Sequence, residues 1–538
     1  MVEAHQWCVT DEGEGAAANV HGSLGKQEVS LTSHVETGGG HDKAGVDAIA
    51  ALLPGPVERI ETHAAIILLT PDRAYKLKKP VAFSFLDFTT LEARQAALEA
   101  ELRLNRRTAP EIYERVLPVV ASASGLALDE PGEPVEWLLE MRRFPEAGRL
   151  DHVAERGELD AALVEALART IAAFHERLEP LVEAGGAAAM REVADGNAED
   201  LRRSVPAVFA SEPVEALVAR TAAELDRQAG LLDARRAAGL VRHCHGDLHL
   251  ANIVLLDGHP VLFDCIEFND AFARVDLLYD LAFLVMDLVD RGYRPAAQGL
   301  LQAWNERCED DAGMALLPLF LSIRAAVRAK VEGFAGHGAP ACGYLDLASR
   351  ALEPVPPRLI AIGGRSGTGK STVARLLAPG MGAMPGAFVL RSDVIRKRLF
   401  GAEPEATLPA EAYAEAVSTE VFERLAARAE VLLEAGRTVI ADGVFGQGWQ
   451  RQRIAAAAAA RGAPFAGFWL EAAQAILEDR VAGRTGDASD ADVEVVRAQA
   501  AMDTSRIDWR RIDAAGGAAG VAATIRQALG QPLPAGDR

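Results

Sequence analysis

The sequence predicts a multidomain chain of the α/β and α+β classes, with an N-terminal two-lobed domain and a C-terminal doubly wound parallel sheet. Three observations predict it. An apolar strand, a glycine loop and a helix follow one another at 359–378. Strands, a helix and a further strand alternate across 64–142, and a polar loop, a hairpin and an acidic residue follow at 245–264. At 538 residues the chain is also too long for one ordinary core.

Composition sets the class of protein. The chain is 49% hydrophobic and 25% charged, as soluble globular proteins are. A formal net charge of −21 disfavours binding to nucleic acid, which needs an excess of Lys and Arg. The five cysteines are scattered without a C-x-x-C pair, and no apolar run could span a membrane. We expect a cytoplasmic protein with reduced thiols and no membrane or nucleic-acid partner.

Five segments divide the chain. Residues 1–45 are rich in Gly and His without any period and are expected to form a disordered tail. A first domain is predicted at 46–350 and a Pro-rich linker at 351–357. A second domain is predicted at 358–530, and residues 531–538 are expected to form a flexible C-terminus.

The first domain begins as a small α+β lobe. Apolar runs at 64–69 and 74–78 predict two strands, and helical spacing follows at 91–107. Another strand is predicted at 135–142, and residues 151–235 are rich in helix-forming Ala, Leu, Glu and Arg.

The segment from His245 to Asn252 has the spacing H-x-D-x-x-x-x-N, and a hairpin ending at Asp264 follows it. This is the shape of a kinase catalytic loop. Asp247 is the candidate base that accepts the proton of an acceptor hydroxyl, and Asn252 and Asp264 offer oxygen ligands that suit Mg²⁺.

An alternative interpretation uses the histidines of the same segment. His243, His245 and His249 could together ligate zinc. This interpretation leaves the regular spacing of the Asp and Asn residues unexplained.

The loop His245-Gly-Asp-Leu-His-x-x-Asn252 with Phe263-Asp264 resembles the aminoglycoside phosphotransferase family, the small-molecule branch of the protein-kinase-like fold. Asp276 and the run 279–282 resemble the helix that braces the catalytic loop in that family. The resemblance implies ATP as phosphoryl donor.

The resemblance also implies an ATP-binding set in the first lobe. Lys76 matches the strand lysine that grips the α/β-phosphates, with Glu101 as its helix partner and Glu99 as the second choice. Glu140-Met141 resembles the hinge that hydrogen-bonds adenine, with Met141 as the predicted adenine-binding residue. Lys78 lies on the same strand face as Lys76 and competes with it, as does the adjacent Lys79.

This lobe departs from the kinase pattern in one respect. No glycine occurs between Gly55 and Gly125, so the lobe has no glycine-rich phosphate loop. A degenerate kinase fold that no longer transfers phosphate therefore stays open as an alternative.

The second domain carries the pattern G-x-x-x-x-G-K-[ST] from Gly364 to Ser371, between a predicted strand and a predicted helix. In that context glycines let backbone N–H groups converge on phosphate oxygens at a helix N-terminus. Lys370 would reach the β/γ-phosphates and the Ser371 hydroxyl would hold Mg²⁺. The nucleotide-binding residues are predicted to be Gly364, Ser366, Gly367, Thr368, Gly369, Lys370, Ser371 and Thr372.

Two further strands of this domain end in acidic residues, where open α/β sheets bind ligands. Asp393 follows the first of them and is the candidate base, with Arg396 one helical step on as an anion anchor. An N-cap role for Asp393 is the alternative. Asp442 ends the next strand and is the candidate Walker B-type ligand of Mg²⁺.

A segment with Arg480 and Arg484 mixes arginine with glycine and small polar residues, as expected of a lid that stabilises a transferring phosphoryl group. Residues 357–530 together resemble the small-molecule P-loop kinases. The whole chain resembles a bacterial fusion of an aminoglycoside-phosphotransferase-like domain and a P-loop ATP-binding domain.

We therefore expect two ATP- and Mg²⁺-dependent phosphotransferase units on one chain, each acting on a hydroxyl of a small molecule. The alternative is a nucleotide-sensing interaction protein with a degenerate first domain. Asp247, Asp393 and Arg396 favour the enzyme, because a sensor needs no base.

Overall fold

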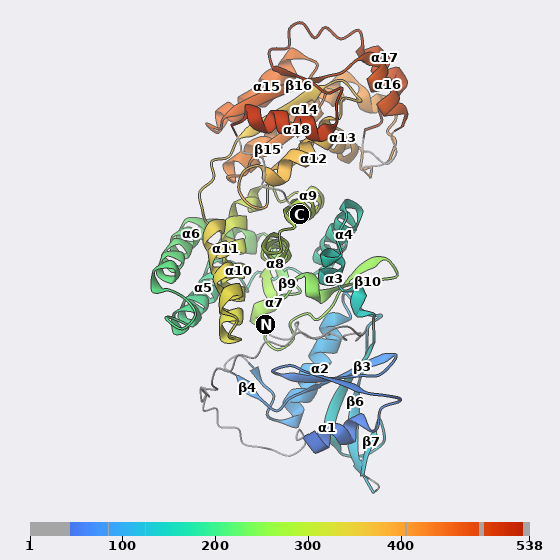
Figure 1. Ribbon diagram of the computed structural model, residues 1–538, viewed down its shortest axis with the longest axis vertical. Helices are drawn as coiled ribbons and strands as arrows, with labels where there is room; N and C mark the ends of the chain where they lie inside the picture. Colours follow the sequence, from blue (N-terminus) through green and yellow to red (C-terminus); the bar gives the residue numbers. More distant parts are fainter. Residues whose placement is uncertain (1–42, 84–85, 124, 404–405, 484–488, 531–538) are drawn as a thin grey trace, which may run out of the picture. The chain divides into compact units, whose positions relative to one another are not determined.

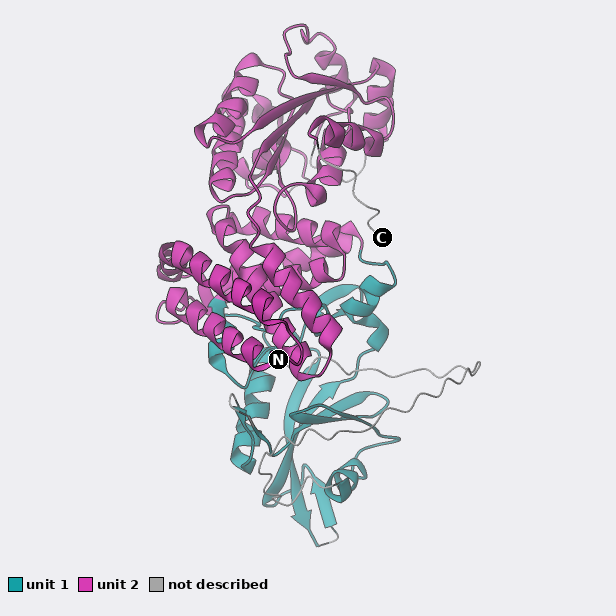
Figure 2. Ribbon diagram, turned by 60° about the vertical axis from the view of Figure 1, so that its left-hand side comes forward, with its two compact units in different colours: residues 1–159, 243–275 teal, residues 160–242, 276–538 magenta. Residues whose placement is uncertain are grey.

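The computed structural model describes residues 43–83, 86–123, 125–403, 406–483 and 489–530. The predicted tail and the predicted flexible end lie outside the described residues. The structure separates into two compact units, one formed by residues up to 159 and 243–275, the other by 160–242 and 276–538 (Figures 1 and 2).

Unit 1 contains a six-stranded antiparallel sheet in the order β1-β2-β3-β8-β6-β7. Apolar residues on both sides of the strands require cover on both faces. Helix α2 packs against one face through Leu98, and helix α1 packs against the other through Val46 and Ile49. The elements are α1 Lys43–Ala50, β1 Glu58–Glu61, β2 Ala65–Leu69, β3 Arg73–Lys78, α2 Leu91–Asn105, β6 Tyr113–Ser122, β7 Gly125–Leu128 and β8 Pro134–Arg142.

Three elements of unit 1 position the first candidate site. Helix α2 begins where the Thr90 hydroxyl accepts a hydrogen bond from the N–H of Ala93. The predicted hairpin forms from β10 (Ile253–Leu256) and β11 (His259–Leu262), and its Val254 and Val261 join the apolar cluster on the α2 face of the sheet.

Unit 2 combines a helical region with a parallel sheet in the order β14-β15-β13-β16-β17. The two adjacent inner strands of this sheet, β13 and β15, are short and fully buried, as expected of a parallel sheet with helices on both faces. The strands are β13 Leu359–Gly364, β14 Phe388–Arg391, β15 Val439–Asp442, β16 Phe465–Glu471 and β17 Arg510–Asp513. The class predicted from the sequence is confirmed for both parts of the chain.

The helices of unit 2 fall into two groups along the chain. The helical region contains α4 Ala161–Arg177, α5 Gly186–Arg203, α6 Ser211–Ala237, α8 Leu277–Asp290, α9 Arg294–Cys308, α10 Leu317–Phe334 and α11 Gly338–Ala351. The sheet is accompanied by α12 Lys370–Leu377, α13 Ser392–Leu399, α14 Glu415–Glu434, α15 Gly448–Ala460, α16 Gln474–Ala482, α17 Val493–Gln499 and α18 Ala518–Ala528. Within the described residues, no helix is both long and apolar enough to cross a membrane.

Helix α9 covers the free edge of the parallel sheet. The Gln302 amide accepts from the N–H of Val389 in β14 and donates to its C=O, both at 2.8 Å. Gln298 donates to the C=O of Ala387 at 2.9 Å. The edge strand thus pairs with side-chain amides where another strand would bind. This is why the helical region groups with the sheet, although a linker is predicted between them at 351–357; independent folding of the two predicted domains stays a prediction.

We expect Gln302→Ala to lower the melting temperature of unit 2. The substitution removes two hydrogen bonds from backbone groups that are shielded by α9, at a cost of about 1–3 kcal/mol. Calorimetry of the full chain measures the shift, which should be several °C. Arg307→Ala is the matched control, because Arg307 lies on the same helix and makes only an exposed ion pair with Glu176. Equal melting temperatures of the two variants would contradict the role of Gln302.

Candidate functional sites

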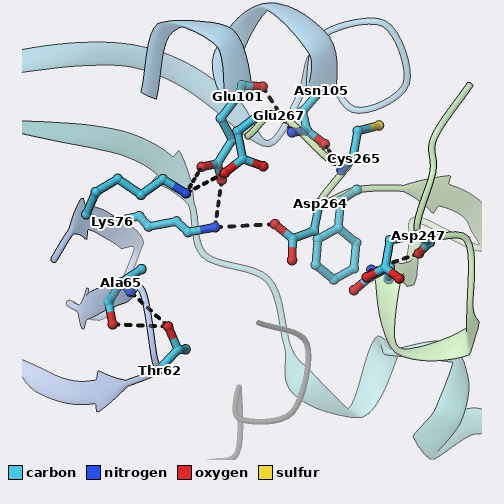
Figure 3. Close-up of polar contacts among 12 residues, drawn as sticks. Thr62, Ala65, Lys76, Glu101, Asn105, Asp247, Asp264, Cys265 and Glu267 are labelled. Carbon is cyan, nitrogen blue, oxygen red and sulfur yellow. Dashed lines mark hydrogen bonds and ion pairs between the residues drawn. The ribbon is translucent and has the colours of Figure 1, made fainter. Parts of the chain in front are cut away.

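In unit 1, Lys76 joins the predicted helix partner to the predicted metal ligand. Its Nζ lies 2.9 Å from Glu101 Oε1 and 3.3 Å from Asp264 Oδ1 (Figure 3). Strand β3 directs Lys76 toward α2, so its contact with Glu101 is buried, while the contact with Asp264 is partly buried. Glu99, the second choice from the sequence, instead accepts from Gln95 on the exposed side of α2.

Lys78 adds a second cation to this cluster. Its Nζ lies 2.9 Å from the other oxygen of Glu101 and 2.7 Å from Glu267, and its side chain is fully buried. Glu267 was not predicted from the sequence. Lys76 and Lys78 are two residues apart and therefore lie on the same face of their strand. Because buried lysines need acidic partners, this spacing indicates a second buried acid.

Asp264 is held in an uncommon backbone conformation. Its φ is +62°, in the left-handed region that non-glycine residues seldom adopt. The N–H of Asp264 donates to the Tyr113 hydroxyl at 3.1 Å, and the next N–H, of Cys265, donates to Asn105 of α2 at 2.8 Å. Such over-determined strain is typical of functional positions.

The loop at 245–252 brings Asp247 and Asn252 together. Asn252 Nδ2 donates to Asp247 Oδ2 at 3.1 Å and to its backbone C=O at 3.0 Å. Burial opposes ionisation of Asp247, but the nearby imidazoles of His249 and His245 hold its pKa well below the usual range. Asp247 is therefore a carboxylate at neutral pH, the form that a base requires.

The histidines of the zinc alternative contact three different groups. His245 Nε2 lies 2.9 Å from the C=O of Phe263, so this imidazole anchors the loop to the end of β11. His249 Nε2 lies 3.4 Å from Asp247, and His243 lies 3.9 Å from Asp270. These contacts give the histidines positioning roles in the loop.

A short turn occupies the place where a kinase has its glycine loop. It joins β1 to β2, and the Thr62 hydroxyl closes it by accepting from the N–H of Ala65 at 3.0 Å (Figure 3). Lys79 Nζ donates to the C=O of Thr62 at 2.6 Å and pairs with Glu61. Lys79, one of the alternatives to Lys76, therefore braces this turn.

Met141 is a buried residue of β8. It pairs with Ala74 of β3 and belongs to the same apolar cluster as Ile60 and Ile67. This places Met141 on the sheet face that also carries Lys76. Its contact with adenine stays a prediction.

In unit 2, the glycine loop between β13 and α12 has the geometry that the motif predicts. Gly364, Gly367 and Gly369 all have positive φ, and a Cβ on Gly364 or Gly367 would lie 2.7 Å from a backbone oxygen. Lys370 Nζ donates to the C=O of Arg365 at 3.1 Å, and so does the buried Thr368 hydroxyl at 2.7 Å.

The predicted Mg²⁺ ligands of unit 2 meet at the strand ends. The Ser371 hydroxyl donates to Asp442 Oδ2 at 2.5 Å, since β13 and β15 are adjacent and parallel. Arg391, which the sequence analysis missed, lies 3.6 Å from the same carboxylate. A hydroxyl and a carboxylate are hard oxygen donors and fit Mg²⁺. Thr372, also in the predicted set, is exposed at the start of α12.

Asp393 lies in the first turn of α13. Burial and the neighbouring Asp442 raise its pKa, which Lys370 and Arg391 counteract in part. A carboxyl with a raised pKa in a site beside a nucleotide loop is the usual setting of a general base.

Arg396 is committed to backbone and hydroxyl oxygens. Its guanidinium donates to the C=O of Ala412 at 2.5 Å and to Ser418 at 3.3 Å, and it stacks on the Tyr413 ring. It therefore braces the segment before α14, and anchoring of an acceptor anion stays a prediction. Asp490, not predicted, binds Lys397, the Tyr413 hydroxyl and the N–H of Leu408 in the same region.

Arg480 ties α16 to the segment after β17. Its guanidinium donates to the C=O groups of Ala514, Ala515 and Gly516 at 2.9–3.0 Å. These bonds occupy the side chain that was predicted to stabilise a phosphoryl group. Arg484, the other predicted lid arginine, lies outside the described residues.

Comparison with known proteins finds a family match in each of the two parts of the chain. Residues 79–317 match the Phosphotransferase enzyme family and residues 359–503 match a family described as AAA domain. The chain thus combines a kinase-like phosphotransferase domain with a P-loop kinase-type domain.

Two curated relatives match the chain over most of their length. The chain is 32% identical over 470 residues to Uncharacterized protein Rv2004c of Mycobacterium tuberculosis and to Uncharacterized protein Mb2027c of Mycobacterium bovis. The match covers 85% of this chain and 92% of each relative, and the chain belongs to their family.

Solved structures of kinases also align with portions of this chain. A choline/ethanolamine kinase family protein from Mesorhizobium loti aligns with 57% of this chain and 95% of its own, at 13% identity and a TM-score of 0.37. A sugar kinase from Janibacter aligns with 32% of this chain and 95% of its own, at 18% identity and a TM-score of 0.25.

Proposed function

We propose that the chain is an ATP- and Mg²⁺-dependent phosphotransferase with two kinase-type units, each transferring the γ-phosphoryl group to a hydroxyl of a small molecule. The observation that carries the proposal is the connected set Glu101–Lys76–Asp264, beside a loop that holds Asp247 as a carboxylate. The matches of both parts of the chain to kinase-type families support phosphoryl transfer in general. The acceptor class comes from the chemistry of the site.

In unit 1, Lys76 would neutralise α/β-phosphate charge, with Glu101 holding it in place. Asn252 and Asp264 would hold Mg²⁺, which supplies charge neutralisation on the phosphates. Asp247 accepts the hydroxyl proton while the acceptor oxygen bonds to the γ-phosphorus and the bond to the β-phosphate oxygen breaks. The products are ADP and a phosphate monoester.

In unit 2, the glycine loop and the N-terminus of α12 would bind the β-phosphate, with Lys370 on the β/γ-oxygens. Ser371 and Asp442 would hold Mg²⁺, and Asp393 would accept the acceptor's proton. The proposed acceptors are neutral or anionic metabolites in a cytoplasmic setting, where ATP is supplied. A survey of ADP release over sugars, nucleosides and sugar nucleotides tests the proposal, and a nucleotide sensor would show no acceptor-dependent release.

We expect MgATP to stabilise the wild-type chain through unit 2, and Lys370→Ala to lose that gain. At 100 times the dissociation constant, a bound ligand adds about 2.7 kcal/mol of stability. Removing the Lys370 ammonium removes the cation nearest the predicted β/γ-phosphates while leaving the helix intact. Calorimetry with and without MgATP measures the effect. Arg375→Ala on the exposed side of α12 is the control, and a full ligand response in Lys370→Ala would contradict the assignment.

A further inference from the structure

The glycine loop of unit 2 is hydrogen-bonded to a side chain from far along the sequence. Gln499 is the last residue of α17, and its Oε1 accepts from the N–H of Ser366 at 2.8 Å. Its Nε2 donates to the Ser366 hydroxyl at 3.2 Å. One amide group thus satisfies both the backbone and the side chain of a loop residue that is 7% exposed.

The Gln499 Oε1 atom accepts from a backbone N–H group of the glycine loop. Loop N–H groups in this motif point at phosphate oxygens, and an amide oxygen carries the same sign of partial charge. Ser366 lies in the first half of the loop, across from the Lys370 end. An acceptor 2.8 Å from its N–H therefore competes with any oxyanion that uses that N–H.

Gln499 belongs to an arm that rests on the loop. Helices α16 and α17 pack together through Leu477, Val481 and Val496. The backbone of α16 lies so close to the loop that a Cβ on Gly367 would be 2.7 Å from the C=O of Leu477. The bonds from Arg480 to residues 514–516 hold the end of α16, and the end of α17 contacts the loop through Gln499.

We propose that Gln499 is a residue of the nucleotide site that occupies the loop in the absence of nucleotide and gives up the Ser366 N–H when a phosphate enters. Binding of the nucleotide then releases the end of α17 from the loop. The inference rests on the proposed function, because it assumes that this loop binds the phosphates of ATP.

The proposal predicts opposite changes in MgATP affinity for two variants of Gln499. In Gln499→Ala the competing acceptor is gone, so MgATP should bind about 3- to 30-fold more tightly, as the loss of one or two net hydrogen bonds allows. Gln499→Glu keeps an acceptor on Ser366 and adds a negative charge beside the phosphates, so MgATP should bind at least about 10-fold more weakly. Val495→Ala, exposed on the same helix, should leave affinity unchanged.

Binding is measured by calorimetric titration of the full chain with MgATP. The binding event that is missing from the titration of Lys370→Ala is the one that belongs to unit 2. Hydrogen exchange at α17 should also increase when MgATP binds to the wild type. If the wild type binds MgATP but Gln499→Ala binds it equally or less tightly, the inference is wrong and the proposed function survives. Wild-type affinity in Gln499→Glu would also overturn it. No binding at all in the wild type would overturn both.

Discussion

Asp247→Asn slows phosphoryl transfer by unit 1 by about 10²–10⁴-fold while MgATP affinity stays near the wild-type value. The loss is that of a general base, because the amide is similar in size to the carboxylate but cannot accept the hydroxyl proton. The lowered pKa of Asp247 fixes the pH dependence. The carboxylate remains ionised from neutral pH down to strongly acidic pH, so this rate should show no acid limb from Asp247 between pH 5 and 8. Acceptor-dependent ADP release across that range measures both effects.

Asp264→Ala should impair MgATP binding, whereas Asp247→Asn should impair the transfer step. The Asp264 substitution removes an oxygen from the predicted Mg²⁺ site and the partner of Lys76 at 3.3 Å, so productive MgATP binding weakens. Asp257→Asn is the matched control, since Asp257 lies at the tip of the β10–β11 hairpin with a φ of +51° that Asn also tolerates. Wild-type rates in both Asp247→Asn and Asp264→Ala would support a degenerate kinase fold in unit 1.

Asp393→Asn should lower acceptor-dependent turnover by unit 2 by at least about 10²-fold with MgATP affinity nearly unchanged. Because the pKa of Asp393 is raised, the wild-type rate should fall as the pH falls through that raised value. An acid limb due to Asp393 in unit 2 therefore lies at higher pH than any due to Asp247 in unit 1. Loss of MgATP binding in this variant, or full turnover, would remove Asp393 from the role of base.

The same substitution should stabilise the metal-free protein at neutral pH. A carboxyl whose pKa is raised by folding binds its proton more tightly in the folded state, so its contribution is favourable at low pH and is lost as the pH rises through the folded value. The neutral amide avoids the cost of an ionised carboxylate beside Asp442. Thermal unfolding without Mg²⁺ at several pH values measures the gain. Asp508→Asn, with a side chain 88% exposed, should show none.

The sequence was informative where function depends on short spacing. The glycine motif, the spacing from His245 to Asn252 and the Ala74-x-Lys76 strand each lie within a few residues, so local pattern predicted their geometry. Family membership supported the same assignment. The helix partner Glu101 was predicted over Glu99, and the structure places it on Lys76.

Contacts between distant polar side chains were not predictable. Gln499 and Ser366 are 133 residues apart, and no periodic pattern relates them. An arginine such as Arg480 has the same sequence signature whether it faces phosphate or backbone carbonyls, and the structure places it against backbone carbonyls. The packing of α9 on the edge of β14 was not predicted for a similar reason. Gln302 pairs with a backbone group, and every residue type has the same backbone groups, so the sequence does not mark the partner.

The hydrogen bonds from Gln298 and Gln302 to β14 affect whether the two parts of the chain can be separated. A coding sequence split at the Pro-rich segment would yield a C-terminal product whose sheet edge, with the backbone groups of Ala387 and Val389, is bare at the moment of synthesis. Bare edges recruit other strands, so such a product would tend to precipitate unless Gln298 and Gln302 arrived from the other polypeptide. Keeping both parts on one polypeptide therefore places Gln298 and Gln302 beside this edge as the chain folds.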